Sequence, residues 1–338
     1  MWATLKTFSL DDDNFPTMIE NVALLLRTMI VNIYKNDSKS KSRIFFYNFH
    51  YNRSSIRETV QKFLTFDAEF EPGTRFSNNL RKYLRVVKKR AISIWIFLVI
   101  NGIVYVLIPF IRPGRHVTEE LYILYGLEPM LESPNYEIVH IVTTISVGFC
   151  VYLMVNVAIY VIVIVGYNEA QMFTICIEVR NLWDDKKIVN EYIRIRLKAI
   201  IHYHVTNIHL FRELNNEFSD TLAIEYSIMS IAIIAELLGG LENTYLQVPY
   251  TVVQIFMDCL SGQRLIDACR EFENALYSCE WENFNADNQK TISLMLLISQ
   301  NTLMLSAGGM ANLNFECLMM ILKSAYSAYT ALKSSINK

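Results

Sequence analysis

Charged residues are scarce in this chain of 338 residues, at 19% of the total, against roughly a quarter in ordinary soluble domains. Glycine and proline are also few, at 11 and 7 residues, whereas phenylalanine and tyrosine number 19 each. These values exclude a collagen-like or disordered chain, because such chains are rich in glycine or proline and poor in aromatics. With 52% hydrophobic residues, the composition argues against a soluble enzyme and indicates that many side chains face a solvent other than water.

Motifs for catalysis and metal binding are missing as well. The sequence has no phosphate-binding loop, nucleophile elbow or HExxH motif, and its six cysteines lack zinc-site spacing. The nearest metal-like cluster is His202, His204 and His209. His202 and His204 lie two residues apart and cannot face the same way on a helix. We therefore expect no enzyme chemistry, no cofactor or metal, and no nucleic-acid partner.

Long apolar runs account for the composition. Residues 138–166 carry no charge over more than the roughly 20 residues that cross a bilayer as a helix. Residues 91–111 are also uncharged and are followed by Pro113 and Gly114, which end a helix. Weaker runs lie at 17–34, 219–241, 244–260, 291–313 and 315–332. Because these runs lack the alternation of barrel strands, the sequence predicts an all-α, polytopic helical membrane protein that forms a single membrane domain over 1–338.

The charges of the connecting segments predict the orientation. Residues 35–90 contain fourteen basic and five acidic residues, so this segment is expected in the cytoplasm, where Lys-rich and Arg-rich loops remain. Residues 112–137 are mainly acidic and are expected outside. Followed backward, this topology makes 17–34 enter the membrane from outside, and no signal peptide precedes it. We therefore expect that a first span, which would place the N-terminus inside, is missing from this chain.

Two of the predicted cytoplasmic segments, 167–218 and 261–290, are too long and too patterned to be simple connectors. Both repeat apolar residues at helical spacing among charged residues. They predict helices that extend from the membrane into the cytoplasm and pack on one another, for self-assembly or for a signalling partner.

Several motifs, in a fixed order along the chain, resemble one known family. The segment SPNYEIVHI at 133–141 is similar to the family's SPxYEIvy, and ALYSCEWENF at 275–284 is similar to its ALYxxxWYxL. The segment LKAIIHYHVTNIHLFRELNNEFS at 197–219 resembles the approach to the fifth helix, and LMLSAGGMANLNFECLMMILKSAYSAYTALKS at 303–334 resembles the C-terminal motif. The family is that of the insect odorant receptors, seven-helix proteins of inverted topology. Its members carry one more helix ahead of 17–34, in agreement with the expected missing span.

The resemblance implies a split last helix. In the family, the seventh helix has a cytoplasmic anchor half, here 291–313, and a pore-lining half, here 315–332, which would leave Lys338 outside. Small side chains also share one face of the second half at 100° per residue. That face and the implied constriction together give the candidate pore residues Ser324, Ser327, Ala331, Leu332, Ser334 and Ser335. Tight helix packing is the alternative use of such a stripe, and Ala325 and Ala328 depart from the family pattern.

The resemblance also implies an apolar ligand pocket in the outer half of the bundle, suited to small volatile organic molecules. Carried over to this chain, the candidate ligand-binding residues are Val22, Leu25, Leu26, Ile103, Tyr105, Thr143, Thr144, Val147, Tyr245 and Tyr250. The walls are apolar with few polar groups, as small-molecule pockets commonly are.

The resemblance further implies a subunit of an odorant-gated cation channel, in the plasma membrane of an olfactory neuron, that assembles with a shared coreceptor into a tetramer. A gustatory receptor of the same superfamily is the nearest alternative. A G-protein-coupled receptor would require the opposite charge pattern, and a transporter would more often show internal repeats or matched broken helices.

Overall fold

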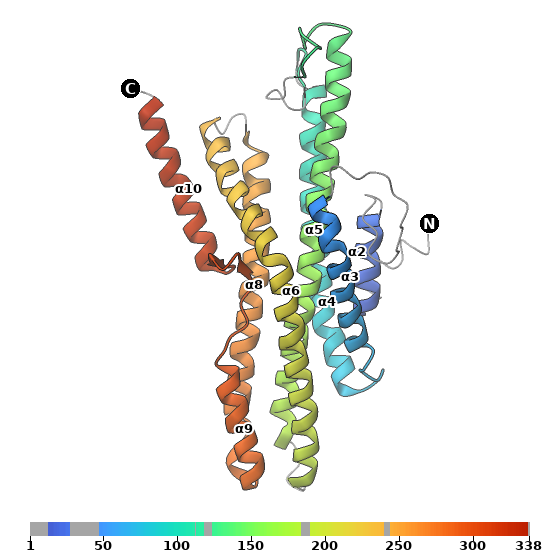
Figure 1. Ribbon diagram of the computed structural model, residues 1–338, viewed down its shortest axis with the longest axis vertical. Helices are drawn as coiled ribbons and strands as arrows, with labels where there is room; N and C mark the ends of the chain where they lie inside the picture. The colour runs from blue at the N-terminus through green and yellow to red at the C-terminus, as the bar shows by residue number, and fades with distance from the viewer. Residues whose placement is uncertain are drawn as a thin grey trace.

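A computed structural model describes residues 13–27, 47–111, 113–117, 124–183, 190–239 and 244–336. These residues form a bundle of long helices that stand side by side (Figure 1). The helices are α2 (Phe15–Arg27), α3 (Tyr47–Asp67), α4 (Arg75–Ile111), α5 (Asn135–Arg180), α6 (Asn190–Leu238), α8 (Gln247–Tyr277), α9 (Ala286–Ser299) and α10 (Phe315–Ile336). Two 3-10 turns, η1 (Asn181–Trp183) and η2 (Trp281–Asn283), and two short strands, β1 (Ser306–Ala307) and β2 (Ala311–Asn312), complete the described part.

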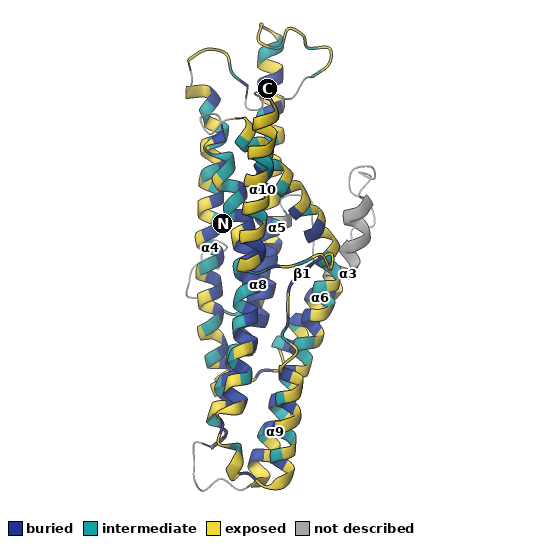
Figure 2. Ribbon diagram, turned by 90° about the vertical axis from the view of Figure 1, so that its left-hand side faces the viewer, coloured by how far each residue is buried: buried dark blue, intermediate teal, exposed yellow. Residues whose placement is uncertain are grey.

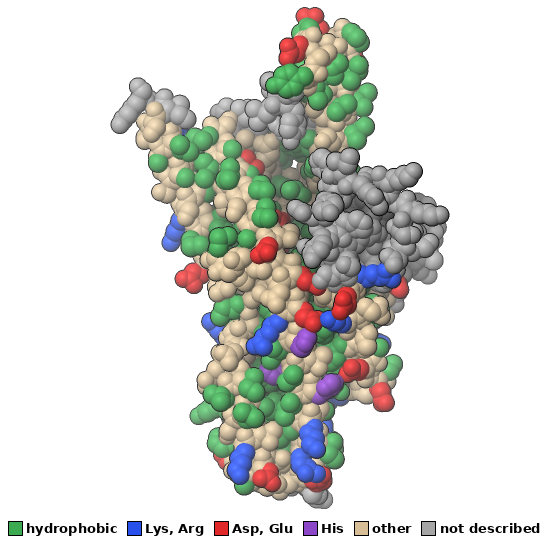
Figure 3. Space-filling view, in the orientation of Figure 1, with side chains coloured by type: hydrophobic (Ala, Val, Ile, Leu, Met, Phe, Trp, Pro, Cys, Tyr) green, Lys and Arg blue, Asp and Glu red, His purple; other side chains and the backbone are tan. Residues whose placement is uncertain are grey.

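Helices α4, α5 and α6 are long and apolar enough to cross a membrane, judged by length and composition. Helix α5 has 46 residues, a length of about 69 Å at ~1.5 Å per residue, against about 30 Å for the hydrocarbon core. The helices therefore continue well beyond a membrane at one end. We call the end near Arg75 inner and the end near Ile111 outer; the Lys and Arg side chains visible in Figure 3 gather mainly toward the inner end.

The buried core lies in the inner half of the bundle, around α5 (Figure 2). From Val155 to Val179 almost every residue of α5 is buried, because α2, α4, α6 and α8 surround it. The outer halves have the opposite character. Large apolar side chains such as Ile100, Ile145 and Ile231 are more than half exposed there, as expected of surfaces that meet lipid or another subunit.

Two buried glutamates of α5 connect the inner helices. Glu169 accepts hydrogen bonds from Arg90 of α4, at 2.5 Å, and from Arg264 of α8, at 3.0 Å. The side chain of Glu169 is only 4% exposed. About two and a half turns further toward the inner end, Glu178 pairs with Arg75 of α4, at 2.9 Å, and also with Arg196 of α6.

Helix α2 runs in the direction opposite to the one expected from the charge pattern. Asp13, just before α2, pairs with Arg85 near the inner end of α4, and the ring of Phe15 lies 3.9 Å from that of Tyr167. The carbonyl of Leu25 instead accepts a hydrogen bond from Tyr152, further toward the outer end of α5. The prediction that 17–34 enters from outside is therefore wrong for residues 17–27, and 28–34 lie outside the described residues.

The prediction fails because 35–90 is not a single connecting loop. The segment contains helix α3, which runs from the outer side toward the inner end along α6. Glu69, which follows α3, contacts His202 at 3.1 Å, whereas Thr59, earlier in α3, donates a hydrogen bond to Glu217 at 2.8 Å, further toward the outer end of α6. An additional helix between α2 and α4 reverses the predicted direction of every segment that precedes it in the chain.

The apolar run 291–313 is not one helix. Helix α9 ends at Ser299, and the end of the run folds into the β1–β2 hairpin, in which Ser306 pairs with Asn312 and Ala307 with Ala311. Its glycines, Gly308 and Gly309, have φ values of 59° and 68°, a region that glycine adopts without strain. The amide of Gly308 donates to the Ser219 carbonyl at 2.8 Å, which docks the hairpin on α6.

The three histidines of α6 point to different neighbours. His202 contacts Glu69 and His209 contacts Glu213, while His204 is buried with its ring 4.3 Å from that of Phe272 in α8. Burial lowers the pKa of His204 to about 4, so its neutral ring acts as a packing group between α6 and α8.

Removal of the Glu169 charge tests the inner network. We expect Glu169→Gln to lower the free energy of unfolding by about 2–4 kcal/mol, because it leaves two arginines facing a neutral group in a buried site. The measurement is thermal or denaturant unfolding of the purified protein in detergent. Glu191→Gln is the matched control, since Glu191 and its partner Arg194 are both more than half exposed and such a pair contributes less than about 1 kcal/mol. Equal effects of the two changes would contradict the structural role of Glu169.

Candidate ligand pockets and pore helix

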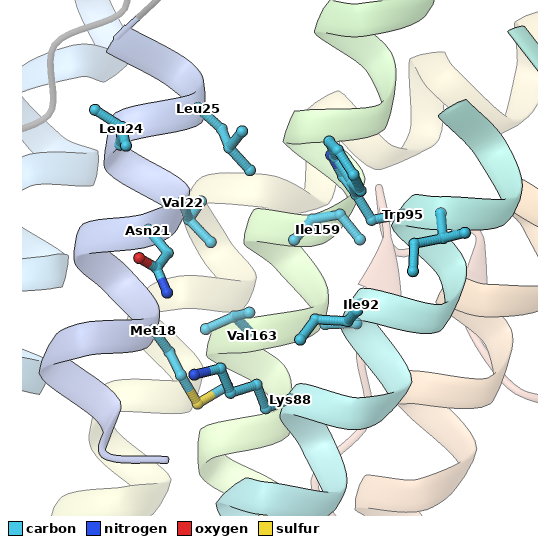
Figure 4. A pocket seen from close by; sticks show the side chains of 12 residues that line it. Met18, Asn21, Val22, Leu24, Leu25, Lys88, Ile92, Trp95, Ile159 and Val163 are labelled. Atoms are coloured by element: carbon cyan, nitrogen blue, oxygen red, sulfur yellow. The ribbon is translucent and has the colours of Figure 1, made fainter. Parts of the chain in front are cut away.

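A cavity of about 440 Å³ lies between α2, α4 and α5 (Figure 4). Its walls are almost entirely apolar and include Met18, Val22 and Leu25 from α2, Ile92 and Trp95 from α4, and Ile159 and Val163 from α5. Its volume falls within the range of roughly 300–1,000 Å³ that small-molecule pockets occupy.

The polar groups of this cavity lie at its two ends. Lys88 of α4 is 4% exposed and Asn21 of α2 is 7% exposed, and Figure 4 shows both at the end near Met18, away from Leu25 and Trp95. At the other end the indole N–H of Trp95 donates to Asn156 of α5 at 3.4 Å. The cavity is therefore an apolar chamber with a cation and an amide at its inner end.

The structure separates the predicted ligand residues into two groups. Val22 and Leu25 line the inner cavity, so they do not lie at the outer end where the resemblance placed them. The reason is the reversed direction of α2. The side chain of Leu26 lies outside the described residues.

The second group lies toward the outer end, where α4 meets the start of α8. The hydroxyl of Tyr105 accepts a hydrogen bond from the amide of Gln247 at 2.8 Å, and the amide of Asn101 donates to the carbonyl of Leu246 at 3.3 Å. Tyr250, one turn into α8, packs against the core. Its buried hydroxyl has no hydrogen-bond partner in the part of the chain that the structure describes.

The remaining predicted residues differ in burial. Thr143 is buried and donates to the carbonyl of Val139, whereas Thr144 and Val147 are half-buried on the same helix. Ile103 and Tyr245 are 54% and 49% exposed and so turn much of their surface away from the bundle. Inward-facing members of the outer group are thus Tyr105, Thr143 and Tyr250.

Sequence reasoning missed His140, near the outer end of α5. It is 8% exposed, and neither ring nitrogen has a hydrogen-bond partner among the described residues. Phe110 of α4 and Tyr136 pack against its ring at 4.6 and 5.6 Å between centroids. The signal available in the sequence was a single histidine in an otherwise apolar run, which is more often a core residue than a functional one.

Every candidate pore residue is exposed in the single chain: Ser324, Ser327, Ala331, Leu332, Ser334 and Ser335. The buried residues of α10 are Cys317, Leu318 and Ala325, all in the first half of the helix. In Figure 1, α10 leans away from the other helices toward its C-terminal end. The outer half of α10 is therefore not covered by its own bundle.

The base of α10 is held tightly against α8. The rings of Phe315 and Phe256 stack with their centroids 6.2 Å apart, and Asn314 caps the helix by accepting the amide of Cys317 at 2.8 Å. Gly262 of α8 faces the backbone carbonyl of Leu313 so closely that a Cβ at this position would overlap the oxygen.

Comparison with known proteins identifies the family. The family model for seven-transmembrane odorant receptors matches residues 42–326. The chain belongs to this family. Within it, the hairpin and α10 form the C-terminal motif, and α5 and α6 are the long helices that connect the membrane part to the inner end.

Curated relatives and solved structures agree with this assignment. The chain is 25% identical to odorant receptor 82a and 24% identical to odorant receptor 30a of Drosophila melanogaster, over 60% and 68% of its length. These matches span 54% and 62% of the two relatives, and a match to the putative odorant receptor 85d of the same species spans 35% of that protein. The fold is similar to that of the insect olfactory receptor OR5 from Machilis hrabei in complex with eugenol, with a TM-score of 0.71 at 12% identity over 96% of this chain and 82% of that one.

The tight contact at Gly262 yields a test of how α10 is positioned. We expect Gly262→Ala to displace Leu313 and the base of α10, because the neighbour is backbone and cannot rotate away, at a cost of about 1–3 kcal/mol. The readouts are thermal stability and disulfide cross-linking between cysteines introduced at Phe256 and Phe315. Gly148→Ala is the control, since nothing lies within 4 Å of a Cβ there. An unchanged cross-linking yield in Gly262→Ala would show that this contact does not hold the helix.

Proposed function

We propose that this chain is an odorant receptor subunit, which binds a small volatile molecule in the outer half of its bundle and opens a cation pore lined by α10. The observation that carries the proposal is the exposure of α10. The outer half of α10 is not covered by its own bundle, and one of its faces bears serines and alanines. Neighbouring subunits can cover this helix, and α10 helices of several subunits can then enclose a water-filled path.

The proposed odorant site uses the outer group of residues on α4, α5 and α8. The Tyr105–Gln247 hydrogen bond holds α4 against α8, and the Tyr250 hydroxyl supplies a buried polar group. Thr143, Thr144 and Val147 would form the wall from α5. Apolar walls with one or two hydroxyls suit a small, mainly apolar organic molecule with few hydrogen-bonding groups, the class to which eugenol, bound by the related receptor of Machilis hrabei, belongs.

The proposed partner is the olfactory coreceptor, in a heteromeric complex at the plasma membrane. The apolar side chains exposed on α9, such as Leu294, Leu297 and Ile298, support assembly through the inner end as well as through α10. Exposed apolar side chains that cluster on one helix commonly mark a surface that contacts another protein or a membrane.

Co-expression tests the function as a whole. We expect little odorant-evoked current from the chain alone and a fast cation current when it is expressed with the coreceptor, persisting when G-protein signalling is blocked. Tyr250→Phe should raise the half-maximal concentration about 3–10-fold for odorants that carry a hydrogen-bonding group, because one hydrogen bond is lost, and should leave hydrocarbon odorants unaffected.

The matched control is Tyr245→Phe, because that side chain is 49% exposed. Equal shifts for both variants would argue against the outer pocket. A current that disappears when G-proteins are blocked would argue against direct gating.

The pore assignment is tested by single cysteines along the outer half of α10. Replacement of Ser327, Ala331 or Ser334 by cysteine should give current that a water-soluble thiol reagent blocks, whereas replacement of Tyr326 or Tyr329 should not. The expected pattern has the helical period, because only one face of a pore helix meets water. Reactivity without that period, or loss of surface expression at the small positions alone, would identify the stripe as a packing contact.

A further inference from the structure

We infer that the inner cavity between α2, α4 and α5 is a second binding site, and that it takes an amphipathic acid, with its anionic group at Lys88 and Asn21 and its apolar chain directed toward Trp95. The inference does not rest on the proposed odorant function, because it concerns another cavity and another ligand class.

The cavity is separate from the proposed odorant site. Trp95, at its outer end, precedes Tyr105 by ten residues on α4, a rise of about 15 Å along the helix at ~1.5 Å per residue. Val22 and Leu25 enter the cavity from α2, while the outer site is built with α8, which contributes no residue to the cavity wall. A molecule in the cavity therefore cannot contact the Tyr250 hydroxyl.

Lys88 is the reason for an anionic group. Its side chain is 4% exposed and is the cationic group among the described residues that line the cavity, where most of the other side chains are apolar. An ammonium has three donors, so it can bind a carboxylate or phosphate oxygen in addition to the contacts it already makes. Asn21, 7% exposed on the facing helix, adds an amide at the same end, as Figure 4 shows.

The remaining wall is suited to a hydrocarbon chain. From Lys88 to Trp95, α4 rises about 10 Å past Ala91 and Ile92, and α5 closes the opposite side with Ile159 and Val163. These side chains offer no hydrogen bonds, so the chain of the ligand is recognised by burial alone.

The rim indicates how such a molecule enters. Leu24 and Ile96 line the cavity but are 36% and 46% exposed, on helices whose outward surface is apolar. A molecule dissolved in the bilayer with its acid group near the inner surface would meet Lys88 at the depth of the lipid headgroups and the rim within the hydrocarbon. The shared chemistry, an anionic oxygen on an acyl chain, belongs both to free fatty acids and to anionic phospholipids.

The experiment uses quenching of tryptophan fluorescence in the purified full chain in nanodiscs of zwitterionic phospholipid. The probes are a fatty acid brominated on its chain and the brominated alcohol of the same length. We expect the acid to quench wild type with saturation and at about tenfold lower concentration than the alcohol, since the acid adds a charge-assisted hydrogen bond. Trp95→Phe should remove the saturable component.

Three further variants decide the case. Lys88→Gln should bring the acid to the affinity of the alcohol, Lys88→Arg should retain the preference for the acid, and Ile92→Phe should weaken both probes by filling the cavity. Ile100→Phe, at a position 56% exposed on the same helix, is the control and should match wild type. If Lys88→Gln fails to fold, Lys88→Arg and Ile92→Phe still test the site.

Addition of an anionic phospholipid to the nanodiscs distinguishes the two sources. Weaker quenching by the acid would assign the site to a membrane lipid, and unchanged quenching would assign it to the free acid. Equal quenching by acid and alcohol in wild type, or quenching by the acid that Ile92→Phe and Lys88→Gln leave unchanged, would overturn the inference.

Discussion

The fold depends on two buried carboxylates in the middle helix of the bundle. Each of Glu169 and Glu178 is shared by two arginines from different helices, so that α5 is joined to α4 twice, to α8 once and to α6 once. Long helices that slide past one another lose little apolar contact, because Leu, Ile and Val side chains can repack at a neighbouring turn. A carboxylate that pairs with two arginines from different helices can do so at only one axial alignment of those helices. These pairs therefore fix the relative heights of the helices, and with them the positions of both cavities and of α10.

Much of this architecture could be predicted from the sequence, and the failures have physical causes. Long uncharged runs identify α4 and α5, because few structures other than a bilayer-spanning helix contain about 20 consecutive uncharged, mainly apolar residues. The direction in which a helix crosses the membrane is harder to predict, because it is inferred from the charges of the neighbouring loops. The amphipathic helix α3 carries charges along its length, so its composition resembles that of a loop. A topology that leaves out α3 predicts the opposite direction for α2. Composition also fails between Ser299 and Leu313, because an apolar run with two glycines folds as readily into a hairpin as into a helix.

The candidate site shows the same division. A resemblance assigns residues to helices, and the structure places Tyr105 on α4 and Tyr250 on α8, toward the outer end. It does not suffice for Val22 and Leu25, whose height depends on the direction of α2. Lys88 carried no visible signal, because it stands within Lys88–Arg90, a basic cluster of the kind that usually lies at a membrane surface. Only packing shows that this lysine turns into the bundle while Arg90 turns toward Glu169.

The attachment of α10 has a mechanical consequence. The helix is fixed at its base, between the hairpin and α8, and it is buried in its first half only, so it behaves as a lever with its fulcrum at Leu313. Its 22 residues make an arm of about 33 Å, and a tilt of about 5° at the base would carry the far end through about 3 Å. A rotation that hardly moves the contact at Gly262 thus displaces Ser335 by about the width of a water molecule.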